Sequence, residues 1–515
     1  MGGRLHGADD RRKPSAVRLG LNVGAGLTSS IWAAVLGLVV VPVYLKYLGI
    51  EAYGLIGFFA TVQALFQILD LGMAPTINRE IARYSASGRW DDAGNLLHTI
   101  AVIYWCVAGL ICIAMMAFAH TISGHWLKSE TFQRETVTHA VMLMGLVIAC
   151  RWPTGLYQGA LNGMQRVAVS SGINIAMVSL SALGAVCVLA FVSPTVDAFF
   201  LWQAGVGFIY AIVVRWAAWR AIGRAGETGF DVRALRSIWR FSAAMMALTF
   251  AGLVFSQLDK VLLSKLLSLA AFGQYTLAGV VASALGILIT PFYNAIYPRF
   301  SAYVARGQQT QLLELYNVSG RLLATVLFPV AMVIAVDGDD LIRLWIGNPQ
   351  LAEKVAPLAA LLAIGSAVHG TMYIPHALLL SQGKTFIPLT INLVLLVIMV
   401  PVTVCFALAY GALGGAIAWV ILHALYVLLG TWLMQRYIGN STGVPWLLHE
   451  IGVPFLICGV IGLLARYIIQ TIDMPVYAKL EVVILLALVS VSATFAASPK
   501  MRAAVFRPMR AKLGG

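Results

Sequence analysis

The chain has 515 residues, of which 60% are hydrophobic and 11% are charged, and its mean hydropathy is +0.86. Soluble domains contain about 45–50% apolar and about 25% charged residues, so this composition excludes an ordinary soluble protein. Apolar blocks of about 20 residues, the length that crosses a bilayer, repeat from end to end without a period of two. The sequence therefore predicts an all-α integral membrane protein rather than a β-barrel.

The formal net charge is +14. The basic residues mark the ends of the apolar blocks and do not cluster with aromatic residues on a polar segment. We therefore interpret them as topology signals that face an anionic inner leaflet, and we expect no nucleic-acid partner. All six cysteines lie within apolar blocks, which is typical of packing residues and not of a disulfide framework or a metal site. The polar N-terminus lacks a signal-peptide pattern, so we expect the first span to be retained.

Glycine, proline and charged residues divide the chain into about fourteen predicted transmembrane helices of the length that a bilayer requires. The connecting turns near Gly383 and Gly411 are very short. The predicted spans, in chain order, are 20–45, 53–78, 97–119, 137–162, 167–192, 196–219, 237–265, 269–298, 314–336, 355–381, 386–409, 411–435, 446–470 and 477–497.

The distribution of basic residues provides an internal check on this division. If the N-terminus is cytoplasmic, 25 of the 35 Lys and Arg residues fall in segments on the inner side and eight fall on the outer side. The remaining two, Arg151 and Lys260, lie within spans. An incorrect number of spans would scramble this alternation, so the pattern favours an even number of spans with both termini in the cytoplasm.

Two segments of the chain resemble each other and indicate an internal repeat. Residues 51–90 align with residues 270–309, and this alignment places Tyr53 and Gly54 opposite Phe272 and Gly273. The copies begin six spans apart, an even number, so the two halves share one orientation and are related by an axis along the membrane normal. The pattern predicts two pseudo-symmetric six-helix lobes followed by two C-terminal helices.

The predicted domain organisation follows from these spans. The segments are a cytoplasmic N-terminal tail (1–19), an N-lobe (20–222), a cytoplasmic inter-lobe linker (223–236), a C-lobe (237–436), the last two helices (437–498) and a basic cytoplasmic tail (499–515).

No enzymatic motif is apparent. The GKT triplet within "SQGKT" at 381–385 lacks the first glycine of a phosphate-binding loop, because residue 378 is leucine, and no strand precedes it. The "HE" pair at 449–450 is not followed by a second histidine at zinc spacing, and the nine histidines show no metal pattern. The predicted outer loops are too short for a catalytic domain. We therefore expect no enzyme, no metal and no cofactor.

The stretches "YLKYLGIEAYGLIGFFATVQALFQILDLGMAPTINREIARY" and "FSQLDKVLLSKLLSLAAFGQYTLA" resemble bacterial polysaccharide flippases of the Wzx type. That group belongs to the superfamily of multidrug, oligosaccharidyl-lipid and polysaccharide exporters, which also contains the lipid II flippase. The resemblance extends along the chain and includes the fourteen-span plan. Its most specific parts are the "YLG…YG" step, the "LDLG" ending with a following "R.IA", and the "LDK" before "FG.Y".

The resemblance implies two lobes around a central cavity that opens inward or outward. The cargo would be an undecaprenyl-diphosphate-linked oligosaccharide, moved from the cytoplasmic to the periplasmic leaflet of a bacterial inner membrane by alternating access. An H⁺ or Na⁺ gradient would drive it, and a polysaccharide polymerase and glycosyltransferases would be functional partners in O-antigen or exopolysaccharide biosynthesis. The alternatives are a cation-coupled multidrug exporter, a lipid II flippase, and a non-transporting scaffold or synthase subunit.

Arg151 is the first candidate for contact with this cargo. It lies in "LVIACRWPTGLYQGALNG", near the middle of the fourth predicted span, where an arginine costs about 2.5–3.5 kcal/mol. A guanidinium can pair with a diphosphate through two hydrogen bonds, and Pro153 frees backbone groups nearby. Gln158 follows about two turns later on roughly the same face. The alternative is a structural arginine, neutralised by a carboxylate or by carbonyl groups of a neighbouring span.

Three carboxylates are candidates for binding the coupling ion: Asp259, Asp70 and Glu80. Asp259 and Lys260 are adjacent in the seventh predicted span and point about 100° apart, so Lys260 either joins the substrate site or extends towards the outer interface. Asp259 could also pair with Arg151 when no cargo is bound.

Arginines at the predicted cytoplasmic mouth complete the candidate site. Arg79 and Arg83 could attract the diphosphate, as could Arg299 at the matching position of the other lobe. For Arg79 and Arg83 we favour the alternative, which is anchoring at the positively charged inner surface.

Overall fold

The computed structural model describes residues 16–70, 72–223, 229–231, 236, 250 and 252–498. Most of the predicted N-terminal tail, the predicted C-terminal tail, most of the inter-lobe linker and the first part of the seventh predicted span lie outside the described residues. Residues 16–19, the end of the predicted N-terminal tail, already belong to a helix. The chain divides into two compact units: unit 1 comprises 1–40, 66–120 and 138–247, and unit 2 comprises 41–65, 121–137 and 248–515. Among the described residues no strand occurs apart from one isolated bridge.

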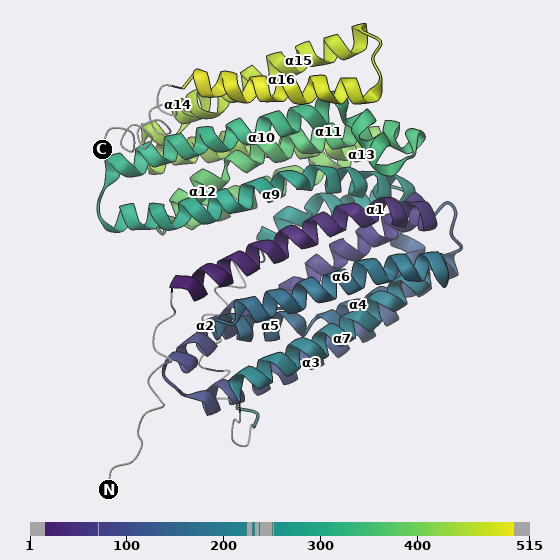
Figure 1. Ribbon diagram of the computed structural model, residues 1–515. Helices are drawn as coiled ribbons and strands as arrows, with labels where there is room; N and C mark the ends of the chain where they lie inside the picture. The colour runs from purple at the N-terminus through teal and green to yellow at the C-terminus, as the bar shows by residue number, and fades with distance from the viewer. Residues whose placement is uncertain are drawn as a thin grey trace. The chain divides into compact units, whose positions relative to one another are not determined.

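Helices form nearly all of the described structure (Figure 1). The N-terminal helices are α1 (Ala16–Phe66), α2 (Met73–Ala86), α3 (Trp90–Thr121), α4 (Arg134–Arg151), α5 (Thr154–Gly163), α6 (Val167–Phe191) and α7 (Val196–Ile222). The later helices are α9 (Leu269–Ala305), α10 (Gln309–Ile346), α11 (Pro349–Thr371), α12 (Tyr373–Ser381), α13 (Phe386–Tyr437), α14 (Val444–Trp446), the π-helical turn η4 (Leu447–Gly452), α15 (Val453–Thr471) and α16 (Val476–Ala496).

Eleven helices within the described ranges are long and apolar enough to cross a membrane. Helices α1 and α13 are each interrupted at a glycine with positive φ, Gly49 with φ 81° and Gly411 with φ 60°. Glycine adopts this left-handed backbone without the steric cost that a Cβ atom brings. Helix α13 therefore holds two of the predicted spans, and α1 holds the first predicted span and the beginning of the second. Residues 252–266, at the end of the seventh predicted span, are also helical. The total of fourteen stays a prediction.

The surface of these helices is apolar, as a bilayer requires. On α15 the exposed fractions of Leu456, Val460 and Leu463 are 65%, 67% and 72%. In water such a continuous apolar face would be a binding or aggregation surface, whereas lipid chains solvate it without cost. The protein is therefore a multi-pass helical membrane protein.

The second predicted span, 53–78, is not one continuous helix. Helix α1 ends at Phe66, a 3₁₀ turn covers Gln67–Asp70, and α2 begins at Met73. The Asp70 carboxylate accepts a hydrogen bond from the Ala74 backbone N–H at 3.2 Å. A side chain that caps a backbone donor in this way favours the start of a new helix. The apolar pattern concealed this break because both helices are apolar at the junction.

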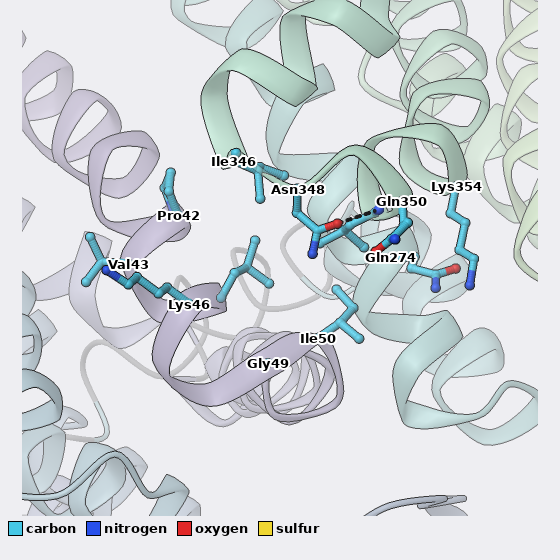
Figure 2. A pocket seen from close by; sticks show the side chains of 13 residues that line it. Pro42, Val43, Lys46, Gly49, Ile50, Gln274, Ile346, Asn348, Gln350 and Lys354 are labelled. Carbon is cyan, nitrogen blue, oxygen red and sulfur yellow. Dashed lines mark hydrogen bonds between the residues drawn. The ribbon is translucent and has the colours of Figure 1, made fainter.

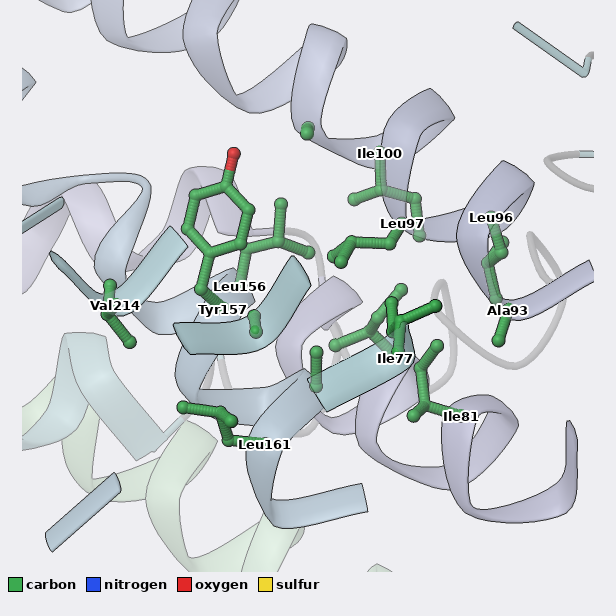
Figure 3. Close-up of a cluster of buried hydrophobic side chains, with 14 of the residues drawn as sticks. Ile77, Ile81, Ala93, Leu96, Leu97, Ile100, Leu156, Tyr157, Leu161 and Val214 are labelled. Atoms are coloured by element: carbon green, nitrogen blue, oxygen red, sulfur yellow. The ribbon is translucent and has the colours of Figure 1, made fainter. Parts of the chain in front are cut away.

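An apolar core holds α2, α3, α5 and α7 together within unit 1 (Figure 3). Ile77 and Ile81 of α2 pack with Leu97 of α3 and Leu156 of α5, and all four are fully buried. A glycine of α5 contributes, because a Cβ atom at Gly159 would lie 2.9 Å from the Ala74 carbonyl oxygen. Small residues let two helices approach this closely where lipid provides no hydrophobic driving force.

In unit 2 the aligned repeat positions are in contact with each other. A Cβ atom at Gly54 would overlap the Leu269 carbonyl oxygen, and one at Gly273 would overlap the Ile50 carbonyl oxygen. Gly273 stands 219 positions after Gly54, and Leu269 stands 219 positions after Ile50. The contact is therefore reciprocal, as a two-fold axis between the repeated segments produces.

Gly273→Leu is expected to lower the free energy of unfolding by about 1–3 kcal/mol, because the new side chain must displace backbone and not a flexible side chain. The matched control is Gly279→Leu on the same helix, since no atom lies within 4 Å of a Cβ atom built there. Thermal unfolding of the two purified variants in detergent, followed by tryptophan fluorescence, checks the difference. Equal midpoints would contradict the close-contact interpretation.

Candidate functional site

Arg151 is the last residue of α4, at a break in the fourth predicted span. Helix α4 ends there and α5 starts at Thr154, so Pro153 interrupts the helix as the sequence predicts. The guanidinium Nη2 donates hydrogen bonds to Ser181 Oγ of α6 at 3.2 Å and to Gln203 Oε1 of α7. A hydroxyl and an amide thus orient the guanidinium. The structure thus places a positioned cation among three helices of unit 1.

Gln158 lies in a second polar network on the same helices. Its amide Nε2 donates to the Tyr210 hydroxyl, which donates to Asn174 Oδ1 at 2.9 Å. The Asn174 amide in turn donates to Ser29 Oγ at 2.8 Å. This chain of bonds joins α5, α7, α6 and α1. Hydrogen bonds of this kind satisfy polar groups that would otherwise be costly within an apolar bundle.

The three predicted charged residues of α2 form a single cluster. Glu80 is buried, and its carboxylate forms ion pairs with Arg79 at 2.6 Å and Arg83 at 2.7 Å. The side chains of the two arginines are 52% and 62% exposed. Two cations share one carboxylate, and both arginine side chains are more than half exposed at the protein surface. An acidic group could be recognised there.

The other two candidate carboxylates have different surroundings. Asp70 accepts hydrogen bonds from the Tyr104 hydroxyl and the Ala74 N–H. The second of these caps the start of α2, which gives Asp70 a structural role. Asp259 is buried and accepts a hydrogen bond from the Tyr275 hydroxyl at 2.7 Å through Oδ2. Its other oxygen, Oδ1, is buried and has no hydrogen-bond partner among the residues that the structure describes. Of the three, Asp259 is the group whose second oxygen remains available to a small cation.

The two remaining candidate cations, Lys260 and Arg299, are less buried than Asp259. Lys260 is half-buried, and Arg299 is exposed on α9, next to the stacked rings of Tyr293 and Tyr297. Arg151 belongs to unit 1 and Asp259 to unit 2, so their predicted pairing stays a prediction.

A pocket of about 670 Å³ lies in unit 2, at the start of α11 (Figure 2). Lys46 and Lys354 supply positive charge, and Gln274, Asn348 and Gln350 supply amide groups. Asn348 is held in place because its side-chain oxygen accepts the Leu351 N–H at 3.0 Å, the dashed line in the figure. Amides and ammonium groups are suited to sugar hydroxyls and phosphate oxygens. The sequence pattern places both lysines on the outer side.

Two features of unit 2 escaped the sequence analysis. Arg321 of α10 pairs with Glu450 of η4 at 2.9 Å, and both side chains are nearly buried. Three histidines, His369, His376 and His423, gather with aromatic residues between α9, α11, α12 and α13. The sequence signals were present: charged and titratable residues within apolar spans are functional candidates by default. Their partners are distant in sequence, however, and spacing alone does not reveal them.

These features define a class: a multi-pass helical membrane protein with polar and charged groups inside its helix bundles. The fold agrees with solved transporters. A structure titled "Lipid II flippase MurJ, inward closed conformation" matches with a TM-score of 0.68 at 12% identity, covering 91% of this chain and 98% of that one. A multidrug resistance MATE family transporter of the MOP superfamily, in an inward-facing conformation, matches with a TM-score of 0.64 at 14% identity, covering 82% and 98%.

The sequence comparisons assign the chain to a protein family. The family model "Polysaccharide biosynthesis protein" matches residues 19–304. A protein of Shigella flexneri named "Putative O-antigen transporter" is 22% identical over 394 residues, which are 76% of this chain and 91% of the relative. The chain belongs to the polysaccharide biosynthesis protein family, and the predicted resemblance to polysaccharide flippases is confirmed.

Proposed function

We propose that this protein flips an undecaprenyl-diphosphate-linked oligosaccharide from the cytoplasmic to the periplasmic leaflet of a bacterial inner membrane, coupled to an ion gradient. Family membership and the name of the Shigella flexneri relative support polysaccharide transport, and the fold supports a transporter rather than an enzyme. Both termini would lie in the cytoplasm. Glycosyltransferases would supply the cargo, and a polymerase would extend it after transfer.

The observation that carries this proposal is the oriented guanidinium of Arg151. A lipid diphosphate must carry its negative charge past an apolar barrier, and bidentate pairing with an arginine lowers that cost. A multidrug exporter for cationic compounds requires anionic groups at its binding site. Here the hydrogen bonds to Ser181 and Gln203 hold a cation in place, which favours an anionic cargo.

The test is deletion of the gene in its host, with two measurements: surface polysaccharide and the pool of lipid-linked oligosaccharide inside the cell. We expect the polymer to disappear while complete lipid-linked intermediates accumulate, and the wild-type gene to restore both. Unchanged polymer with new sensitivity to cationic drugs would instead support the exporter. A block in peptidoglycan synthesis would support a lipid II flippase.

Asp259→Asn is expected to reduce polysaccharide export about tenfold or more if this residue binds the coupling ion. The amide oxygen of the substituted side chain would still accept the Tyr275 hydroxyl proton, so the fold is retained while the ionisable oxygen is lost. The matched control is Asp197→Asn, a conservative change at the outer start of α7. Export by complemented deletion cells, normalised to the protein level in the membrane, measures the effect. Full export by Asp259→Asn would exclude this carboxylate as the coupling group.

A further inference from the structure

The three histidines of unit 2 form one aromatic cluster within its helix bundle (α11 to α13 in Figure 1). The ring centroids of His369 and His423 are 4.5 Å apart, and the Trp419 ring lies 4.3 Å from His423. The Tyr426 ring lies 5.1 Å from His369. Histidines from α11 and α13 are therefore in direct ring contact, and Trp419 and Tyr426 meet them in T-shaped arrangements.

The cluster extends from the interior of unit 2 to its surface. His423 is 2% exposed, whereas Tyr373, whose ring lies 5.7 Å from that of His369, is 37% exposed. Tyr293 of α9 lies 6.0 Å from Tyr373 and 6.4 Å from His376. Imidazole and phenol groups thus form a continuous path from a buried ring to an accessible one.

The hydrogen bonds determine which nitrogen of His423 can take up a proton. Its Nδ1 lies 2.8 Å from the Trp419 carbonyl oxygen, and a carbonyl only accepts, so Nδ1 carries the hydrogen atom. Nε2 is then the basic nitrogen. Trp419 is held in place because its Nε1–H donates to Ser366 Oγ at 3.3 Å, and because Gly365 lies directly beneath its ring.

The surroundings of His369 and His423 favour one added proton shared by the two rings rather than one on each. Two imidazolium rings at 4.5 Å would repel each other strongly in an apolar bundle, so His369 and His423 can share one proton but cannot both be charged. From α10, Leu327 packs near Gly370 and adds no charge.

The seventh span also packs against this region. Phe255 contacts Tyr426, with ring centroids 5.7 Å apart. Asp259 follows one helical turn later, bonded to Tyr275, with Lys260 beside it. The histidine cluster and the segment that carries Asp259 are thus linked through one ring contact.

We propose that His369, His376 and His423 constitute a proton-binding site through which the transport cycle is coupled to the proton gradient. Water at the exposed end supplies the proton, an N–H bond forms on an imidazole nitrogen, and that bond breaks when the cluster opens to the other side of the membrane. The inference rests on the proposed function as a gradient-driven flippase. Histidine suits this task because it changes charge near neutral pH, which a sodium site would not require.

The first experiment titrates the purified full-length protein in lipid nanodiscs, with histidine labelled at ¹³Cε1, between pH 5 and 8 by NMR. We expect wild type to show a coupled titration that disappears in both His369→Gln and His423→Gln. The matched control is His449→Gln: His449 makes the same bond to a carbonyl four residues earlier, to Pro445 at 2.8 Å, but is exposed. Wild type without a cluster titration in this range overturns the proposal.

The second experiment measures export in deletion cells that carry each variant, with and without a protonophore. Wild type and His449→Gln should restore export that the protonophore abolishes. His369→Gln, partly exposed and thus tolerant of substitution, should export at least tenfold less. Full, protonophore-sensitive export by His369→Gln and His423→Gln would overturn the proton site and leave the flippase intact. Normal polymer in the uncomplemented deletion strain would overturn the flippase, whatever the histidines bind.

Discussion

Arg321→Ala is expected to lower the free energy of unfolding by about 3–5 kcal/mol, because it leaves Glu450 nearly buried without its cation. The two side chains are only 10% and 11% exposed, and the pair joins α10 to η4. Arg321 Nη2 also donates to the His449 carbonyl oxygen, so the substitution removes two attachments at once. The measurement is the midpoint of thermal unfolding of the purified protein in detergent.

A matched control lies on the same helix. Arg343 pairs with Asp339 at 2.8 Å, but both side chains are 42% exposed, and exposed pairs contribute about 0–1 kcal/mol. Arg343→Ala should therefore have little effect. The double variant Arg321→Met with Glu450→Leu should recover most of the loss, because no buried charge remains. A similar midpoint for Arg321→Ala and Arg343→Ala would contradict the structural role of the buried pair.

Arg151→Ala is expected to abolish polysaccharide export while the protein still inserts into the membrane. The charge that would meet the diphosphate is lost, and Gln203 is left buried with one bond fewer, which costs about 1–3 kcal/mol. Complementation of the deletion strain, with protein level measured by immunoblot of the membrane fraction, checks this result. Arg220→Ala serves as the control, because it removes a cation that lies over Trp216 at the end of α7.

The structural and functional roles of Arg151 can be separated by a second variant. Arg151→Met with Gln203→Leu replaces the polar pair by apolar residues of similar volume, so it removes the unsatisfied group together with the charge. If this double variant exports normally, Arg151 only holds helices together. If it inserts stably and does not export, the guanidinium itself serves the cargo.

The comparison of sequence and structure is clearest at the helix breaks. Pro153 predicted the interruption after Arg151, because a proline has no N–H to donate and obstructs the preceding turn. The short turns at Gly383 and Gly411 were predicted from glycine alone, and both residues have positive φ angles. The break between Phe66 and Met73 was not predicted, because the apolar pattern continues across it; in the structure Asp70 accepts the Ala74 N–H and the Tyr104 hydroxyl of another helix there.

Among the polar residues, too, some contacts can be anticipated from the sequence and others are revealed only by the structure. Arg79, Glu80 and Arg83 are neighbours on one helix, so their ion-pair cluster could be anticipated from helical spacing. No sequence pattern pointed to Glu51 as a buried residue with specific partners. Its carboxylate nevertheless accepts hydrogen bonds from the Ser129 hydroxyl and from the backbone N–H groups of Glu130 and Thr131. Those partners lie in a loop beyond α3, and this contact helps place residues 121–137 in unit 2.

By itself, the sequence determined that this chain is a multi-pass helical membrane protein with an internal repeat and charges inside its spans. Hydropathy, turn residues and repeated positions are local properties, and a bilayer imposes strong rules on them. Only the tertiary structure decided which intramembrane groups are paired and which gather into a site. His369 and His423, or Arg321 and Glu450, meet because helices from distant parts of the chain pack side by side, and no local pattern encodes that choice.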